Sequence, residues 1–216
     1  MALAKINNWL KNLFLQSIFI SKSMHESLLK YITRHSKTPL TESDEEVIKK
    51  TFVPKKLRKR QYFLQEGEVC KDHAFIVKGA MRQYSVDDKG IEHVVRLSIE
   101  NWWVGDRESA SMLTPSVYNI DAWEDTEVLQ AATDMWNQLY SIPAINEMWR
   151  NLDQNYAIAT QKRLKAHISF SAEQRYSDLE KTYPQFLQRF PRHIIASYLG
   201  ITKETLSRIR GLAVKK

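Results

Sequence analysis

The spacing of apolar residues changes along the chain and predicts helices first, then strands, then helices again. Over residues 24–53, Leu28, Leu29 and Ile32 recur at the three- and four-residue spacing of a helix, and Pro39 ends that run. A second short helix is predicted after the proline, because the acidic residues there suit the positive end of a helix dipole. The chain is therefore expected to begin with helices rather than strands.

Residues 1–23 precede these helices and are predicted to form an amphipathic leading helix or an extension. Apolar residues such as Trp9, Leu13 and Phe14 are interrupted by Lys and Asn, so no apolar run is long enough to cross a bilayer. Neither an apolar signal-peptide core nor a small-residue cleavage site is clear. We therefore expect no membrane passage.

Between residues 54 and 135, apolar and polar residues alternate, which is typical of strands. Strands are predicted at 74–77, 81–86 and 93–99, with residues 87–90 as the hairpin turn between the last two. Short strands about ten residues apart predict a β-barrel or β-sandwich.

A long helix is predicted over residues 144–170, which contain neither Pro nor Gly. Apolar residues at alternating four- and three-residue steps form a seam along it: Ile145, Trp149, Leu152, Tyr156 and Ala159. Such a seam suits packing on the chain's own β-domain or on the same helix of a second copy. Because of the segment that follows, we favour a homodimer with these five residues at its interface.

Residues 191–210 predict two helices joined by a tight turn. Pro191 suits the first position of a helix, and the small Ala196 lets a second helix cross closely. Gly200 supplies the positive φ that the turn needs, and Thr202 is placed to cap the second helix. The small core between the two helices is expected to consist of Ile195, Leu199, Ile201, Leu206 and Ile209.

The outward face of the second helix carries the residues of a DNA-reading helix. Arg208 suits the O6 and N7 atoms of guanine, while Glu204 can accept from a cytosine amino group or hold Arg208 in place. Lys203 suits a base or a phosphate. Phosphate contacts are predicted for Arg192, Thr202, Thr205, Ser207 and Arg210. A solvated surface hairpin is the plainer interpretation, but the proline, glycine, cap, core and basic face together favour double-stranded DNA as the partner.

Charge and cysteine content restrict the kind of partner and the cellular compartment that we expect. The formal net charge is +7, and the segment from Arg189 to Lys216 holds seven Lys or Arg against one acid, Glu204. Concentrated positive charge suits a polyanion, since binding releases its counterions. The single cysteine, Cys70, excludes an intrachain disulfide and indicates a reducing compartment, here the cytoplasm.

The chain resembles the Crp/Fnr family of bacterial transcription regulators over about residues 25–216. The resemblance depends on Gly67-Glu68, on the segment from His73 to Gly79, and on the segment from Leu199 to Arg208. It implies an α+β chain with a cyclic-nucleotide-binding-like β-roll (a jelly roll) over 24–140, a dimerisation helix over 141–170 and a helix-turn-helix domain over 171–216. In the family, residues matching Lys203, Glu204 and Arg208 read the operator bases, and RNA polymerase is a further partner.

The chain departs from the cyclic-AMP-binding members of this family in their phosphate cassette. Gly105 fits the cassette, but Asp106 replaces the glutamate that takes the ribose hydroxyl. No arginine stands at 117–119, where the family's arginine takes the cyclic phosphate. We therefore expect that cyclic AMP is not the effector. A second departure is that only six residues follow Arg210.

Two interpretations remain for the aromatic residues near the cassette: they fill the β-roll, or they line a pocket for an apolar effector. The residues of such a pocket would be Arg96, Trp102, Trp103, Asp106, Arg107, Tyr118 and Trp123. The basic run 55–60 is interpreted as a solvated strand face rather than a second DNA contact.

Other function classes find less support. No Ser–His–Asp order, metal-spaced histidine cluster or glycine-rich phosphate loop is evident, so an enzyme, a metal and a cofactor are not expected. A haem- or redox-sensing regulator has only Cys70 in its favour. A cyclic-nucleotide-responsive module acting through protein contacts stays as the alternative, although the basic C-terminal helices argue against it.

Overall fold

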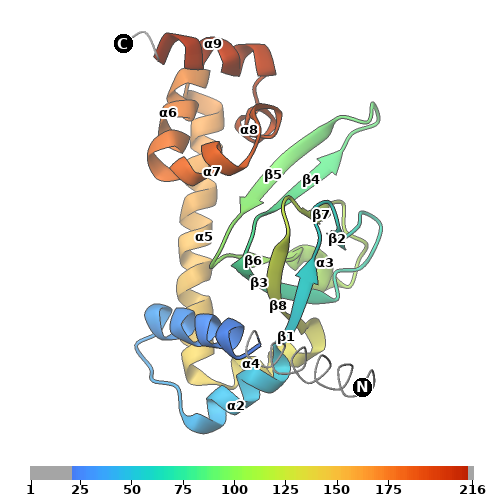
Figure 1. Ribbon diagram of the computed structural model, residues 1–216, viewed down its shortest axis with the longest axis vertical. Coiled ribbons are helices and arrows are strands. Elements are labelled where there is room, and N and C mark those ends of the chain that lie inside the picture. The colour runs from blue at the N-terminus through green and yellow to red at the C-terminus, as the bar shows by residue number, and fades with distance from the viewer. Residues whose placement is uncertain (1–20, 214–216) are drawn as a thin grey trace, which may run out of the picture.

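The computed structural model describes residues 21–213, and Figure 1 shows a β-domain beside one long helix, with smaller helices at both ends of that helix. The predicted leading helix over 1–23 lies outside the described residues, apart from 21–23, which begin a helix over residues 21–35. No helix among the described residues is both long and apolar enough to span a membrane.

The N-terminal helices pack under the β-domain. Leu28 and Ile32 of the helix over 21–35 are buried, as is Ile48 of α2 (Glu42–Thr51). Thr41 caps α2 through a reciprocal capping box with Asp44, which supplies acceptors that the first turn of a helix otherwise lacks. The two predicted helices are confirmed.

The β-domain consists of two four-stranded antiparallel sheets with the strand orders β1-β8-β3-β6 and β2-β7-β4-β5. Its strands are β1 (Val53–Leu57), β2 (Tyr62–Leu64), β3 (Asp72–Lys78), β4 (Met81–Val86), β5 (Glu92–Ser98), β6 (Trp103–Val104), β7 (Asn119–Ala122) and β8 (Thr126–Ala132). Alternate residues such as Met81, Ile120 and Val128 are buried between the sheets. The three strands predicted from alternation are confirmed.

Three short helices follow strands of this β-roll, the first after β6 and the other two after β8. They are α3 (Arg107–Met112), the 3-10 helix η1 (Thr133–Met135) and α4 (Trp136–Tyr140). The last of these leads directly into the long helix α5 (Pro143–Ser169), which has 27 residues and runs the length of the molecule (Figure 1).

The seam predicted along α5 is divided between two environments. Ile145 and Trp149 are buried in the chain's own core, and Leu152 is half-buried against it, so the prediction that these three face a partner is corrected. Tyr156 and Ala159, further along the helix, are exposed. The sequence spacing could not separate the two halves, because both use the same heptad pattern.

The C-terminal helices gather at the far end of α5 (Figure 1). They are α6 (Ala172–Thr182), α7 (Pro184–Arg189), α8 (Arg192–Leu199) and α9 (Lys203–Ala213). They share a core with the outer face of the second sheet, which we call the interdomain core. Its members from the β-roll are Ala80, Tyr84, Val94, Leu97 and Ile99, and those from the helices include Tyr176, Leu179, Phe186, Phe190, Ile194, Leu206 and Ile209.

Candidate DNA-binding helices and the closed effector cassette

The turn between α8 and α9 is closed by a glycine in the left-handed region. Gly200 has φ 65° and ψ 40°, and the Ile201 N–H that follows donates to the Ala196 carbonyl at 3.0 Å. Glycine adopts this conformation without the steric cost that a Cβ brings. Pro191 differs slightly from expectation: it is the N-cap of α8, one residue before the first helical position.

The two helices are held at a fixed angle by the core that the sequence predicted. Four of its members are buried and Ile201 is half-buried against them: Ile195, Leu199, Leu206 and Ile209. Thr202 caps the second helix, since its Oγ1 accepts from the Thr205 N–H at 3.1 Å. The helix-turn-helix predicted over 191–210 is therefore present.

The outward face of α9 is open to solvent. Lys203, Glu204, Ser207 and Arg208 are all exposed. Arg208, 65% exposed, forms an ion pair with Glu173 of α6 at 3.6 Å, so the suggestion that Glu204 holds it is corrected. A pair this exposed contributes about 0–1 kcal/mol, which leaves Arg208 free to exchange Glu173 for a base or phosphate.

The remaining phosphate-contact candidates surround this face. Arg192 and Thr202 are exposed at the starts of the two helices, while Thr205 and Arg210 are half-buried at the flanks of α9. Arg210 lies near Tyr176 of α6, on the side of α9 that faces the domain. The structure thus brings the base-reading candidates together on one surface with cations at its edges.

In the cassette, Asp106 is occupied by its own chain. It is buried and accepts from the Glu108 N–H at 3.1 Å, the Ser109 N–H at 3.3 Å and the Ser116 hydroxyl at 2.6 Å. The first two bonds make it the N-cap of α3. Both carboxylate oxygens already have donors from the chain, with which a ribose hydroxyl would have to compete.

Gly105 and Arg107, on either side of Asp106, are also committed. Gly105 has φ 148°, and a Cβ at this position would lie 2.6 Å from Cδ2 of His73, so the glycine is needed for close packing. Arg107 turns toward α5, where it pairs with Asp153 at 2.5 Å and stacks over Trp149 at 5.5 Å. Arg107 is therefore engaged with α5 rather than with the cassette.

The residues of the predicted aromatic pocket contact different parts of the fold. Trp103 lies in the core that the N-terminal helices, α4 and the start of α5 form with the first sheet, which we call the lower core. Its ring centroid is 4.8 Å from that of Trp149. Trp102 packs on α7, 5.5 Å from Tyr183. The others separate as well: Trp123 packs against Phe190 and His193, Arg96 stacks over Tyr156, and the Tyr118 carbonyl lies against Ser116. Trp102 and Trp123 pack against the interdomain core, so none of the three tryptophans belongs to the core between the two sheets that would fill the β-roll.

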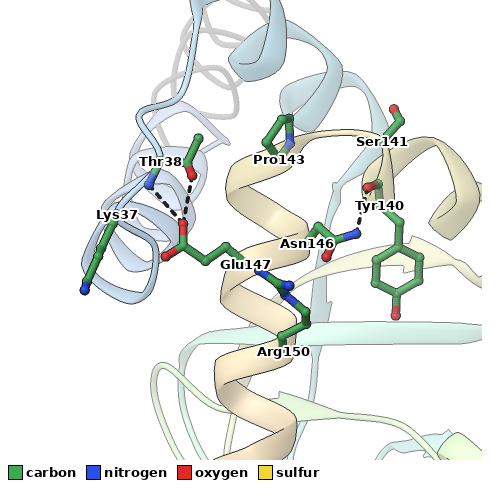
Figure 2. Close-up of a pocket in the computed structure, with 8 residues that line it drawn as sticks. All are labelled: Lys37, Thr38, Tyr140, Ser141, Pro143, Asn146, Glu147 and Arg150. Carbon is green, nitrogen blue, oxygen red and sulfur yellow. Dashed lines mark hydrogen bonds between the residues drawn. The ribbon is translucent and has the colours of Figure 1, made fainter.

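A shallow groove of about 640 Å³ lies elsewhere, between residues 37–38 and the start of α5 (Figure 2). Glu147 in its wall accepts from Ser36 Oγ at 2.7 Å and from the Thr38 N–H and hydroxyl at 3.0 and 2.8 Å. These bonds lower the pKa of Glu147 to about 2. None of the predicted site residues lines this groove.

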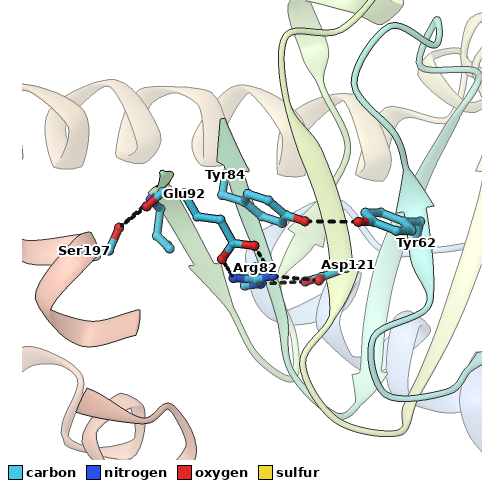
Figure 3. Close-up of polar contacts among 7 residues, drawn as sticks. Tyr62, Arg82, Tyr84, Glu92, Asp121 and Ser197 are labelled. Atoms are coloured by element: carbon cyan, nitrogen blue, oxygen red, sulfur yellow. Dashed lines mark hydrogen bonds and ion pairs between the residues drawn. The ribbon is translucent and has the colours of Figure 1, made fainter. Parts of the chain in front are cut away.

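Sequence reasoning missed the contacts that fasten α8 to the β-roll (Figure 3). Strand β5 is at the edge of its sheet, and there the Val94 N–H donates to Ser197 Oγ at 2.9 Å, while Ser197 Oγ donates to the Glu92 carbonyl at 3.0 Å. The Glu92 carboxylate pairs with Arg82, which also donates twice to Asp121 at 2.9 and 3.0 Å. A serine inside a helix pattern gives no local signal that it satisfies a distant strand edge.

A second set of contacts joins the β-roll to the segment just before α8. Arg189 pairs with Glu100 at 2.5 Å and also with Glu124, while its carbonyl accepts from Trp123 Nε1 at 3.2 Å. These ion pairs raise the pKa of the Arg189 guanidinium against the opposing effect of burial. These contacts attach the segment before α8 to the β-roll.

Comparison with known proteins supports this architecture. Residues 54–142 match the family model of the cyclic nucleotide-binding domain. A search for relatives among curated proteins found no match. Among solved structures, FixK2 from Bradyrhizobium japonicum has a TM-score of 0.65 at 18% identity, with 76% of this chain and 85% of that chain covered.

Two further solved structures agree. A mutant of CooA from Carboxydothermus hydrogenoformans has a TM-score of 0.63 at 16% identity, with 79% of each chain covered. A protein from Eubacterium rectale described as a transcriptional regulator of the Crp/Fnr family has a TM-score of 0.59 at 18% identity, with 82% of this chain and 85% of that chain covered. The chain has the fold of these three solved structures. The predicted α+β class, with β-roll, long helix and C-terminal helices, is confirmed.

The charged side chains next to Gly105 in the cassette are engaged within the chain itself. The carboxylate of Asp106 is already bonded, Arg107 faces α5, and the segment from Ser116 to Asn119 supplies no cation. Among the described residues, no group of three His, Cys, Asp or Glu side chains is placed to hold a metal ion. Cys70 is buried, and burial raises the pKa of its thiol, which disfavours the reactive thiolate.

Proposed function

We propose that this chain is a sequence-specific DNA-binding regulator of transcription, without enzymatic activity, that acts in the cytoplasm. The observation that carries the proposal is the α8–turn–α9 pair: a helix fixed by a buried core, with a fully exposed face of Lys203, Glu204, Ser207 and Arg208. This is the geometry in which a recognition helix enters a major groove while the preceding helix crosses the backbone.

Base readout belongs to Lys203, Glu204 and Arg208. Arg208 makes the bidentate contact to guanine, the pairing that best distinguishes one base pair from the others. Phosphate contacts belong to Ser207 on that face and to Arg192, Thr202, Thr205 and Arg210 around it. These contacts set the register of the protein on DNA without selecting sequence.

The functional unit is a homodimer formed through the exposed half of α5. Leu164 and Ile168 are 60% and 76% exposed, and they lie four residues apart on one face of the helix. A two-fold axis along α5 places the two α9 helices in successive major grooves, about 34 Å apart, on a palindromic operator. RNA polymerase is a further partner of this regulator.

The effector domain controls the position of the DNA-binding helices, through an effector that is not a cyclic nucleotide. The interdomain core and the contacts of Ser197 and Arg189 fix α8 on the β-roll, so a change in the roll alters the spacing of the two α9 helices. An effector shifts this equilibrium only as far as its affinities for the two arrangements differ.

Selection of genomic DNA fragments by the purified protein, at low and at high salt, tests the proposal. We expect an enriched palindrome with half-sites about one helical turn apart. Salt-sensitive binding without an enriched sequence would contradict specific readout. Absence of binding to any fragment would favour a module that acts through protein contacts.

A further inference from the structure

The turn between β1 and β2 presents three consecutive cations to solvent. Arg58, Lys59 and Arg60 are all exposed. Their backbone is fixed, because the Lys59 N–H donates to Asp125 at 2.9 Å and the Arg60 N–H to the Ala122 carbonyl at 2.6 Å. This is the basic run that sequence alone assigned to a solvated strand face.

The fold places this turn next to the DNA-binding helices. The Lys59 amine lies 5.8 Å from the centre of the Trp123 ring, and the Trp123 ring lies 6.2 Å from that of His193 in the first turn of α8. Trp123 therefore bridges the basic turn and the helix-turn-helix. Segments far apart in the sequence lie close together here.

The charge of this surface is not neutralised from within. Among the described residues, none of Arg58, Lys59 and Arg60 forms an ion pair. Of the neighbouring acids, Glu124 is paired with Arg189 and the buried Asp121 with Arg82. Asp125 is the one exposed acid that contacts the turn, so a net positive charge remains.

We propose that Arg58, Lys59 and Arg60 form a second DNA contact, in which the effector domain binds phosphates of the duplex that flanks the half-site read by α9. The proposal rests on the DNA-binding function proposed above. A DNA strand that passes the cations at the start of α8 carries a phosphate for every ~3.4 Å along the axis of the duplex. The next phosphates of that DNA strand then lie against the turn of Arg58, Lys59 and Arg60. Lysine and arginine on a turn suit phosphate oxygens, which bind without selecting sequence.

The test compares two duplexes that carry the selected operator, one ending at its edges and one extended by about one helical turn, ~10 bp, on each side. The variant is Arg58→Gln, Lys59→Gln and Arg60→Asn, with asparagine at the third position because Arg60 has φ 67°. The matched control is Lys30→Gln, Arg34→Gln and Lys50→Gln. It removes the same charge from exposed positions at the opposite end of the molecule (Figure 1).

We expect the turn variant to bind the extended duplex about tenfold more weakly than the control at low salt, with a shallower dependence of log K on log salt by about 2. On the short duplex the two variants should bind alike, and the preferred operator should not change. Lys59→Gln alone should show the same trend more weakly, which guards against misfolding of the triple variant.

Equal affinity of the turn variant and the control for the extended duplex would overturn the proposal. Loss of affinity on both duplexes to the same extent would overturn it too, because the turn would then act on the helix-turn-helix itself. If the unaltered protein binds neither duplex, the proposed function fails and this inference with it. The turn variant could bind anionic vesicles or an acidic protein more weakly than the control does, yet bind DNA as well as the control. That result would assign the surface to a different partner.

Discussion

His73 is a titratable side chain whose surroundings are apolar on nearly every side. Its ring lies 5.7 Å from that of Trp136 and packs against Gly105, and its Nδ1 is buried with no hydrogen-bond partner among the described residues. Burial first, and then the positive charge of Arg107, lower the pKa of His73 to about 4. The folded protein therefore keeps this imidazole neutral at pH values where a free histidine is charged.

A consequence for stability follows from this lowered pKa. Between pH ~6.5 and pH ~4 the unfolded chain binds a proton at His73 that the folded chain does not, so the free energy of unfolding decreases as pH falls through this window. The loss reaches up to about 3 kcal/mol, and no contribution remains above pH ~6.5. Urea unfolding near pH 7.5 and near pH 5 measures it. A His73→Phe variant should lose less stability between the two pH values, and an equal loss in both proteins would contradict this assignment.

Arg208 illustrates how an exposed ion pair leaves a side chain available. Its pair with Glu173 spans 3.6 Å between two largely exposed groups. Arg208→Ala should lower the ratio of specific to non-specific affinity by about tenfold or more for each half-site, equivalent to 1–3 kcal/mol. Competition binding against scrambled DNA measures this ratio.

Arg210→Ala is the matched control for Arg208→Ala. As a phosphate contact, Arg210 should affect specific and non-specific DNA alike, leaving the ratio unchanged. The assignment of base readout fails if the two alanine variants discriminate sequence equally well.

At the scale of elements, the turn between α8 and α9 has a left-handed backbone at Gly200. An alanine at position 200 would have to keep φ near 65°, and its Cβ would lie 3.3 Å from Cε1 of His167. Gly211 offers the opposite case, because it lies within α9 and has open space where a Cβ would be.

These two glycines provide a matched pair of substitutions. Gly200→Ala should lower the free energy of unfolding by about 1–2 kcal/mol, the cost of a left-handed alanine. Gly211→Ala should raise it by about 0.5–1 kcal/mol, since alanine is the better helix former. Thermal or urea unfolding of both variants measures the difference, and stabilisation by Gly200→Ala would show that the turn is not held in the left-handed region.

At the scale of the whole molecule, the two halves of α5 have different surroundings. Its first half is part of the lower core through Ile145, Met148 and Trp149. Its second half leaves Leu164 and Ile168 exposed, although it stays linked to the β-roll where Arg163 donates to the Val95 carbonyl at 2.7 Å. An exposed apolar face on a helix this long is typical of an association surface.

The proposed dimer can be disrupted at this face without disturbing the fold. Leu164→Glu with Ile168→Glu should convert the dimer to a monomer and weaken operator binding by several orders of magnitude, because each monomer then holds only one half-site. Sedimentation equilibrium measures the mass. Lys30→Glu with Lys50→Glu places acids at the opposite end and should leave the dimer intact. A monomeric unaltered protein, or a dimer that survives the α5 substitutions, would contradict this interface.

The local patterns of the sequence were sufficient for the elements themselves. Strand alternation located β3, β4 and β5, the capping residues located α2 and α9, and Gly200 located the turn. They also separated the buried from the exposed face of α9, because a helix fixes which residues share a face. For these features the energy that decides the conformation comes from neighbours within a few residues.

Tertiary structure alone decided which surfaces meet. Ile145 and Tyr156 belong to the same heptad pattern, but one lies in the chain's core and the other faces solvent. The tryptophans near the cassette pack in separate cores rather than around one pocket. Ser197 and Lys59 contact segments that are distant in the sequence. Periodicity specifies the face that an element buries but not what covers it, since that depends on the packing of segments that are remote in the chain.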